Sequence, residues 1–133
     1  MMHKNKITIF FLLMPFLLVG TAIHLGDLIH VSVWNKLPGG NNLSIHCKSK
    51  DNDLGLQTVR PNQDFAFHFY TNFLGTTLFY CRFKTKYGEG VYDIYNYKRD
   101  VDRCNECTWN VTQYGVFGYS HVSEVDFFWP KRP

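Results

Sequence analysis

The stretch Thr76-Thr77-Leu78-Phe79-Tyr80-Cys81-Arg82-Phe83 decides the fold. Its residues alternate with the period of two that is typical of a β-strand. One face of this strand carries Phe79, Cys81 and Phe83, and the other carries Tyr80 and Arg82. A cysteine between phenylalanines on an apolar face predicts half of a disulfide inside a core. We expect a central strand, because an edge strand seldom carries so many large apolar side chains.

The rest of the chain contains further short alternating segments and no sustained helical period. We expect strands at residues 28–34, 43–48, 56–59, 65–70, 76–84, 91–97, 109–114 and 116–119. The first two of these strands should pair as a hairpin across a turn at residues 35–41. The C-terminal tail shows no usable period. About eight short strands separated by turn signals predict an all-β fold, a small antiparallel β-sandwich stabilised by disulfides.

The N-terminus resembles a secretory signal peptide. A short basic leader, Met1–Lys6, precedes the apolar run Ile7–Val19, and Gly20 and Ala22 provide the small residues of a cleavage site. The apolar run is too short for a membrane-spanning helix, which needs about 20 residues. We therefore expect residues 1–22 to be removed and residues 23–133 to form one secreted domain, with no stable membrane insertion.

The charge of the chain is close to balanced. It has 14 Lys and Arg against 11 Asp and Glu, and Lys4 and Lys6 would leave with the signal peptide. This balance indicates no nucleic-acid partner. Two sequons, Asn42-Leu43-Ser44 and Asn110-Val111-Thr112, predict N-glycosylation at Asn42 and Asn110 in a secreted protein.

Four cysteines in a secreted chain predict two disulfides. Cys47 and Cys81 fall on apolar strand faces, and we expect Cys104 and Cys107 to be too close in sequence to pair with each other. Two pairings remain open. We favour Cys47 with Cys107 and Cys81 with Cys104 over the crossed arrangement. A redox or zinc role for the Cys104-x-x-Cys107 motif is disfavoured, since no strand-to-helix context or further ligand pair accompanies it.

No catalytic motif is present in the sequence. A ribonuclease needs two converging histidines, and His46 and His68, both on polar strand faces, are the alternative that we retain for a secreted hydrolase. The Asp51–Gly55 segment has alternating oxygen donors, but it lacks the glycine and glutamate spacing of a calcium loop and is better explained as a turn. We expect no cofactor and no metal.

Several segments, taken in order, resemble the plant self-incompatibility S-protein family, the S-protein homologues. They are residues 31–35, the run Leu43-Ser44-Ile45-His46-Cys47-Lys48-Ser49-Lys50-Asp51-Asn52-Asp53-Leu54-Gly55, residues 65–69, Thr77-Leu78-Phe79-Tyr80-Cys81, and Cys104-x-x-Cys107-x-Trp109. The match covers nearly all of residues 23–133. In one departure, Asn52 replaces the first acid of the Asp-Asp-Leu-Gly run that is common in the family, which lowers the charge of this loop by one.

The resemblance implies a small secreted β-sandwich with two disulfides and a non-enzymatic role. Founding members of the family are ligands secreted by the stigma that meet a pollen membrane protein and trigger rejection of self pollen. We therefore expect an extracellular monomer that acts on a cell-surface receptor or another extracellular protein, with pollen–pistil rejection as one setting. No binding residue transfers from the motif match.

Two charged loops are candidate partner contacts on physical grounds alone, because binding residues concentrate on loops held by a rigid scaffold. The first loop, residues 48–55, contains Lys48, Lys50, Asp51 and Asp53. The second loop spans residues 98–106.

Overall fold

The computed structural model describes residues 26–131, which form nine strands and one short helix within that range. The signal peptide predicted for residues 1–22 lies outside the described residues. The elements are β1 (Leu28–Asn35), β2 (Leu43–Lys48), β3 (Asp53–Val59), β4 (Asp64–Tyr70), β5 (Leu78–Lys84), β6 (Glu89–Asn96), α2 (Tyr97–Asp100), β7 (Glu106–Val111), β8 (Gly115–Tyr119) and β9 (Val125–Phe128).

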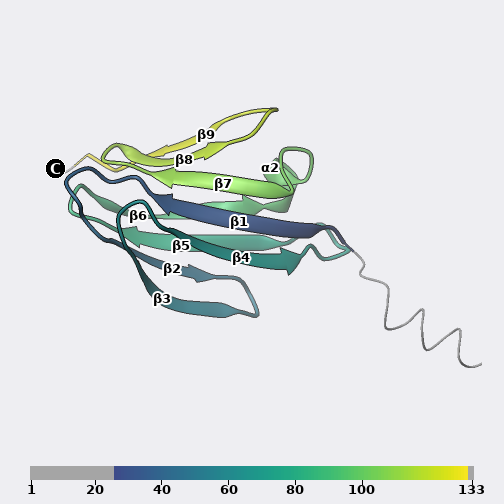
Figure 1. Cartoon of the computed structure of the whole chain (residues 1–133). Coiled ribbons are helices and arrows are strands. Elements are labelled where there is room, and N and C mark those ends of the chain that lie inside the picture. Colours follow the sequence, from purple (N-terminus) through teal and green to yellow (C-terminus); the bar gives the residue numbers. More distant parts are fainter. Residues whose placement is uncertain (1–25, 132–133) are drawn as a thin grey trace, which may run out of the picture.

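Two sheets pack face to face and enclose the core (Figure 1). The five-stranded sheet has the order β4-β1-β7-β8-β9, and the four-stranded sheet has the order β3-β2-β5-β6. Every strand pair is antiparallel except β1 with β7, which is parallel. The predicted all-β sandwich is confirmed.

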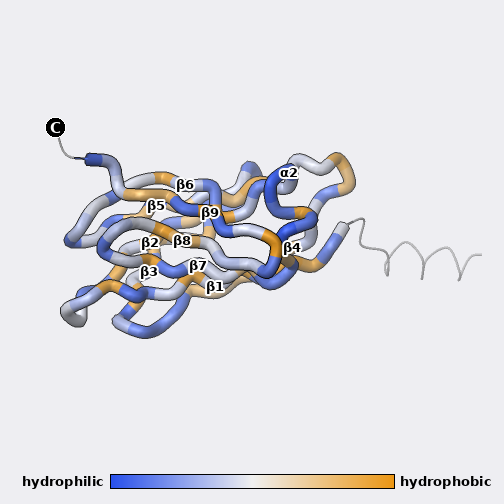
Figure 2. Tube along the Cα trace, turned by 90° about the horizontal axis from the view of Figure 1, so that it is seen from above, coloured by the Kyte–Doolittle hydropathy of each residue, from blue (hydrophilic) through white to orange (hydrophobic). Residues whose placement is uncertain are grey.

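The core follows from the alternation along each strand, visible as changes between hydrophobic and hydrophilic residues in Figure 2. In β5, Phe79, Cys81 and Phe83 are buried, whereas Arg82 is exposed and Tyr80 is half-buried. β5 is an internal strand between β2 and β6. The sequence prediction for this strand is therefore confirmed in both its facing and its central position.

The predicted hairpin between the first two strands is wrong. β1 pairs with β4 and β7, while β2 pairs with β3 and β5 in the opposite sheet. The fully buried Asn35 stabilises the crossing between the sheets: its Nδ2 donates to the carbonyl oxygens of Asn41 and Val59, at 2.8 and 2.9 Å, and its Oδ1 accepts from the amide of Leu37 at 2.9 Å. These bonds satisfy a buried amide that would otherwise destabilise the fold.

Several strand bounds also differ from the prediction, most of all those of β3 and of β7, which spans Glu106–Val111 rather than residues 109–114. β3 begins at Asp53 rather than at Leu56. The regular alternation is interrupted at its start, since Gly55 adopts a φ of 79° within the strand and the register with β2 shifts nearby. β9 was not predicted, since its four residues are too few to show a clear period. Its Phe127 stacks on Trp109 of β7, with ring centroids 5.8 Å apart, so tertiary contact defines this strand.

The favoured disulfide pairing, Cys47 with Cys107 and Cys81 with Cys104, is wrong. The disulfides join Cys47 to Cys81 and Cys104 to Cys107. Cys47 and Cys81 are direct partners across β2 and β5, with Cα atoms 4.0 Å apart, and Cys107 lies in the other sheet. The Cys104 and Cys107 Cα atoms are 5.3 Å apart, within the usual span of a disulfide, because a turn precedes β7.

Candidate functional site

Both predicted contact loops lie at the same end of the sandwich. β2 runs toward this end and β3 away from it, while β4 ends there, α2 follows β6 there and β7 begins there (Figure 1). We call it the loop end and define it by residues 49–52, 71–77, 97–105 and 120–124. The structure thus gathers segments that are distant in sequence into one surface.

The loop between β2 and β3 is held by Asp53. Its carboxylate contacts His46 Nε2 at 2.5 Å and Lys48 Nζ at 3.8 Å, and it accepts the amide of Gly55 at 2.9 Å. The hydrogen bond with His46, followed by that of Gly55, lowers the pKa of Asp53 below its usual value. Lys48 and Asp53 therefore form an ion pair within the loop.

Lys50 and Asp51 occupy the tip of the same loop and are exposed. The structure consequently divides the four predicted contact residues into two classes. Lys48 and Asp53 brace the loop, and Lys50 and Asp51 present opposite charges to solvent. The second pair is better placed to meet a partner.

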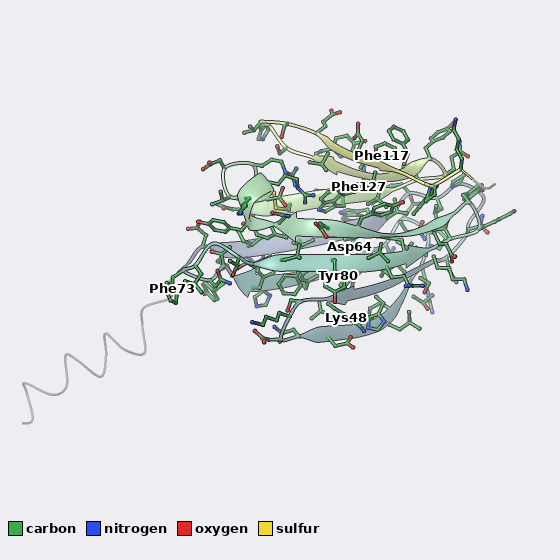
Figure 3. The ribbon with its side chains drawn as sticks, turned by 180° about the vertical axis from the view of Figure 1, so that it is seen from behind. Lys48, Asp64, Phe73, Tyr80, Phe117 and Phe127 are labelled. Carbon is green, nitrogen blue, oxygen red and sulfur yellow. A yellow bond between two sulfur atoms is a disulfide. The ribbon has the colours of Figure 1, made fainter. Side chains whose placement is uncertain are left out.

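The loop between β4 and β5 was predicted only as a connection, yet it carries two large, highly exposed apolar side chains at the loop end. Phe73 and Leu74 are 69% and 70% exposed, and Phe73 projects from this end in Figure 3. Their signal in the sequence is two large apolar residues in succession within a polar turn. Because such exposure costs solubility, it is typical of a surface that meets another molecule.

Asn72 gives this loop a defined shape. Its amide donates to Thr77 Oγ1 at 2.8 Å, its Nδ2 donates to Thr76 Oγ1 at 2.9 Å, and its Oδ1 accepts from the Thr76 amide at 3.0 Å. Gly75, with a φ of 70°, packs against the ring of Tyr97 and allows the sharp reversal. The two apolar residues are therefore presented by a braced turn.

An open hollow of about 640 Å³ separates the two loops. Its lining includes Lys50 and Asn52 from one loop, Asn72 from the other, and Leu78 and Tyr80 from β5. Polar and apolar groups meet in it, which suits a segment of a protein better than a purely apolar ligand.

The third loop, residues 97–105, is anchored from inside. Asp100 is fully buried and accepts hydrogen bonds from Arg99 Nη2 at 2.7 Å, Arg103 Nε at 2.7 Å and the amide of Asn96 at 2.9 Å. Burial raises the pKa of Asp100, but these three partners outweigh burial and lower the pKa below its usual value. Both guanidinium groups also lie over the ring of Trp109, at 5.5 and 5.6 Å from its centre.

The two histidines of the hydrolase alternative do not converge. His46 lies on the outer face of β2 and contacts Asp53, whereas His68 lies on the outer face of β4 and packs against His30 at 5.7 Å between ring centroids. Since β2 and β4 belong to different sheets, the two side chains point away from one another. This arrangement does not form a two-histidine site.

Residues 26–131 contain neither a cluster of metal ligands nor a membrane-spanning helix. No group of three or more His, Cys, Asp or Glu side chains in this range is placed to hold a metal ion. No helix in the same range is long and apolar enough to cross a membrane.

Residues 30–129 match the family model described as plant self-incompatibility protein S1. The chain is 38% identical over 103 residues to self-incompatibility protein S1 of Papaver rhoeas, covering 73% of this chain and 72% of that protein. It is also 38% identical over 81 residues to S-protein homolog 6 of Arabidopsis thaliana, covering 60% of each. Against homologs 6, 27 and 24 of that plant, the match spans 60%, 56% and 53% of the relative's length.

A solved structure of a self-incompatibility protein homologue superimposes with a TM-score of 0.56, covering 81% of this chain and 92% of the other. That protein is described as one of a widespread family of small, highly stable, secreted proteins from plants. At 15% identity the likeness shows a shared fold.

Proposed function

Because the chain belongs to the plant self-incompatibility protein S1 family, we propose that it is a secreted, non-enzymatic ligand that binds a cell-surface partner through its loop end. The solved relative is described as secreted, and the N-terminal sequence resembles a signal peptide. The relative from Papaver rhoeas is named a self-incompatibility protein, so pollen–pistil rejection is the first setting in which to seek the partner.

One observation carries this proposal: a braced turn presents Phe73 and Leu74 beside a hollow that is flanked by Lys50. Large apolar anchors surrounded by polar groups are typical of the centre of a protein interface. The turn is already ordered by Asn72, so little conformational entropy is lost when it binds. The adjacent Lys50 and Asp51 then contribute selectivity more than affinity.

The test is binding of the labelled, purified protein to intact pollen and to other plant cells. We expect Phe73→Ser to weaken binding by about 30-fold or more, the loss expected at an interface hot spot. The matched control is Tyr114→Ser, since Tyr114 is 64% exposed in the turn between β7 and β8 at the opposite end. This control should bind within about twofold of the unmodified protein.

Folding must be unchanged for the comparison to hold. Both substitutions affect exposed side chains, so thermal unfolding should shift little. Equal binding by Phe73→Ser and the unmodified protein would remove the turn from the interface. A double charge reversal, Lys50→Glu with Asp51→Lys, then asks whether the neighbouring loop contributes, and we expect it to alter partner choice or association rate.

A further inference from the structure

The outer face of the five-stranded sheet contains a sequon in an unusual position. Asn110 lies in β7 and points outward, because the alternate residues Trp109 and Val111 are buried. Its direct neighbours in the sheet are Trp34 of β1 and Phe117 of β8. Asn110 is half-buried although it faces solvent, as expected for a small amide between two aromatic side chains.

A groove lies beside Trp34, Asn110 and Phe117 on the same outer face. The next outward residues toward the start of β1 and β7 are Ser32 and Thr108. Both are small, and Ser32 is paired in register with Thr108 and with Ala66 of β4. They form part of the lining of an open groove of about 400 Å³, whose far side carries the polar groups of His30, His68 and Glu106. The groove begins about 7 Å from Asn110, the length of two strand residues.

We propose that Asn110 carries an N-linked glycan that folds back onto this face. The first N-acetylglucosamine packs against Phe117 and against Trp34, where it takes the place of the Lys36 ammonium that lies 5.2 Å from the centre of the Trp34 ring. The following sugars lie over the groove. The C–H groups on one face of a pyranose ring suit the electron-rich face of an aromatic ring. The histidine and carboxylate groups across the groove provide hydrogen-bond partners for sugar hydroxyls.

The modification itself is ordinary chemistry of the secretory pathway. The Asn110 amide nitrogen forms a bond to C1 of the first sugar and loses a proton, while the bond from C1 to a lipid-linked diphosphate breaks and the lipid diphosphate leaves. Transfer precedes folding, so the half-buried state of Asn110 does not oppose it. The proposal rests on the proposed function only in that both require secretion.

The attachment point lies away from the loop end, and the groove extends from it back toward His30, His68 and Glu106. β7 runs away from the loop end, and Asn110 is the next-to-last residue of β7. Asn42, in the other sequon, directly precedes β2 and also lies at the end of the sandwich opposite to the loop end (Figure 1). Glycans at these positions would cover one end and one outer face of the sandwich and leave residues 49–52 and 71–77 accessible.

The experiment uses the full chain secreted from a plant host, with the occupancy of each sequon read by peptide mass spectrometry. We expect Asn110 to be occupied and Asn110→Gln to melt about 4 °C lower or more. Trp34→Ala should cost at least about 4 °C more in the glycosylated protein than in the Asn110→Gln background. Tyr80→Ala, on the outer face of the other sheet (Figure 3), is the matched aromatic control and should cost the same in both.

Two results would overturn the proposal: an unmodified Asn110 in the secreted protein, or a Trp34→Ala penalty that is identical with and without the glycan. Asn42→Gln controls for a general effect of glycan loss, since Asn42 is exposed in a loop. Cell binding separates this proposal from the proposed function. The Asn110→Gln protein should bind cells as the unmodified protein does, whatever the outcome of the melting experiment.

Discussion

At the scale of the residue, Asp100 has the largest concentration of interactions in the loop end. It is a fully buried carboxylate that joins two arginines and the backbone at the end of β6. A buried ion pair contributes little net stability relative to apolar packing, but removal of one partner leaves the other charge uncompensated. Asp100 therefore specifies the position of the third loop.

We predict that Asp100→Asn lowers the free energy of unfolding by about 3–5 kcal/mol, because Arg103 remains buried without its counter-charge. Urea denaturation at pH 7 measures this loss. Asp102→Asn is the matched control, since Asp102 is exposed two residues further along, and should change stability by less than about 0.5 kcal/mol. A similar loss in both variants would mean that the buried network is not the cause.

The direction of the Asp100 pKa shift also predicts a pH dependence. The pKa in the folded state lies below the unfolded value of about 3.9, so the stabilisation is complete above about pH 5 and is lost as the pH falls through the folded pKa. The unmodified protein should therefore lose stability over the acid interval below about pH 5. Asp100→Asn should lose less over this interval, as measured by urea midpoints at each pH. Parallel curves would contradict the assignment.

At the scale of the element, the two disulfides differ in what they connect. Cys47–Cys81 joins two neighbouring strands of one sheet across 34 residues of sequence, and Cys104–Cys107 closes a turn of 3. In the chain-entropy description, a longer closed loop constrains the unfolded chain more. The first disulfide should therefore stabilise the fold more strongly than the second.

We predict a loss of about 4 kcal/mol for Cys47→Ala with Cys81→Ala, and a loss below about 2 kcal/mol for Cys104→Ala with Cys107→Ala. Thermal or urea unfolding of the two double variants measures the difference, and each serves as the control for the other. If the first double variant were impossible to secrete, reduction of the Cys104→Ala with Cys107→Ala protein, which retains Cys47–Cys81, followed by unfolding measures the contribution of the first disulfide. A larger loss for the second pair would refute the entropic account.

The facing of a strand could be predicted from the sequence, but its pairing partners could not. The strand at Leu78–Lys84 was predicted with the correct buried face because its alternation is local and strong. The partners of β1 were not, because residues 36–42 are compatible with a tight hairpin and with a crossing between sheets. The buried side chain of Asn35 favours the crossing, and its three hydrogen bonds exist only after β3 is in place. For the same reason the cysteine partners could not be read from spacing.

At the scale of the whole molecule, the sandwich has two different ends. The loop end presents apolar and charged groups, and the opposite end lies beside both sequons. This difference between the ends follows from strand direction, because the strands bring four segments between residues 49 and 124 to the same end. None of these loops would form a surface alone.

The outward directions of His46 and His68 lead to a prediction about activity. Because the two lie on the outer faces of different sheets, no phosphate could contact both. We predict that the purified protein cleaves no RNA between pH 5 and pH 8, above the level of a preparation of His46→Ala with His68→Ala. Measurement of fluorescent oligonucleotide cleavage decides this, and a rate that vanished only in the double variant would revive the hydrolase alternative.

Local alternation was sufficient to predict the all-β class, the buried face of most strands and the charged loops, because a strand's facing depends on its immediate neighbours. Strand order, the pairing of cysteines, β9 and the convergence of Lys50 with Phe73 depended on the tertiary structure. Each of these joins residues that are far apart in the chain, and only the packing of two apolar sheet faces selects among the arrangements that local patterns allow.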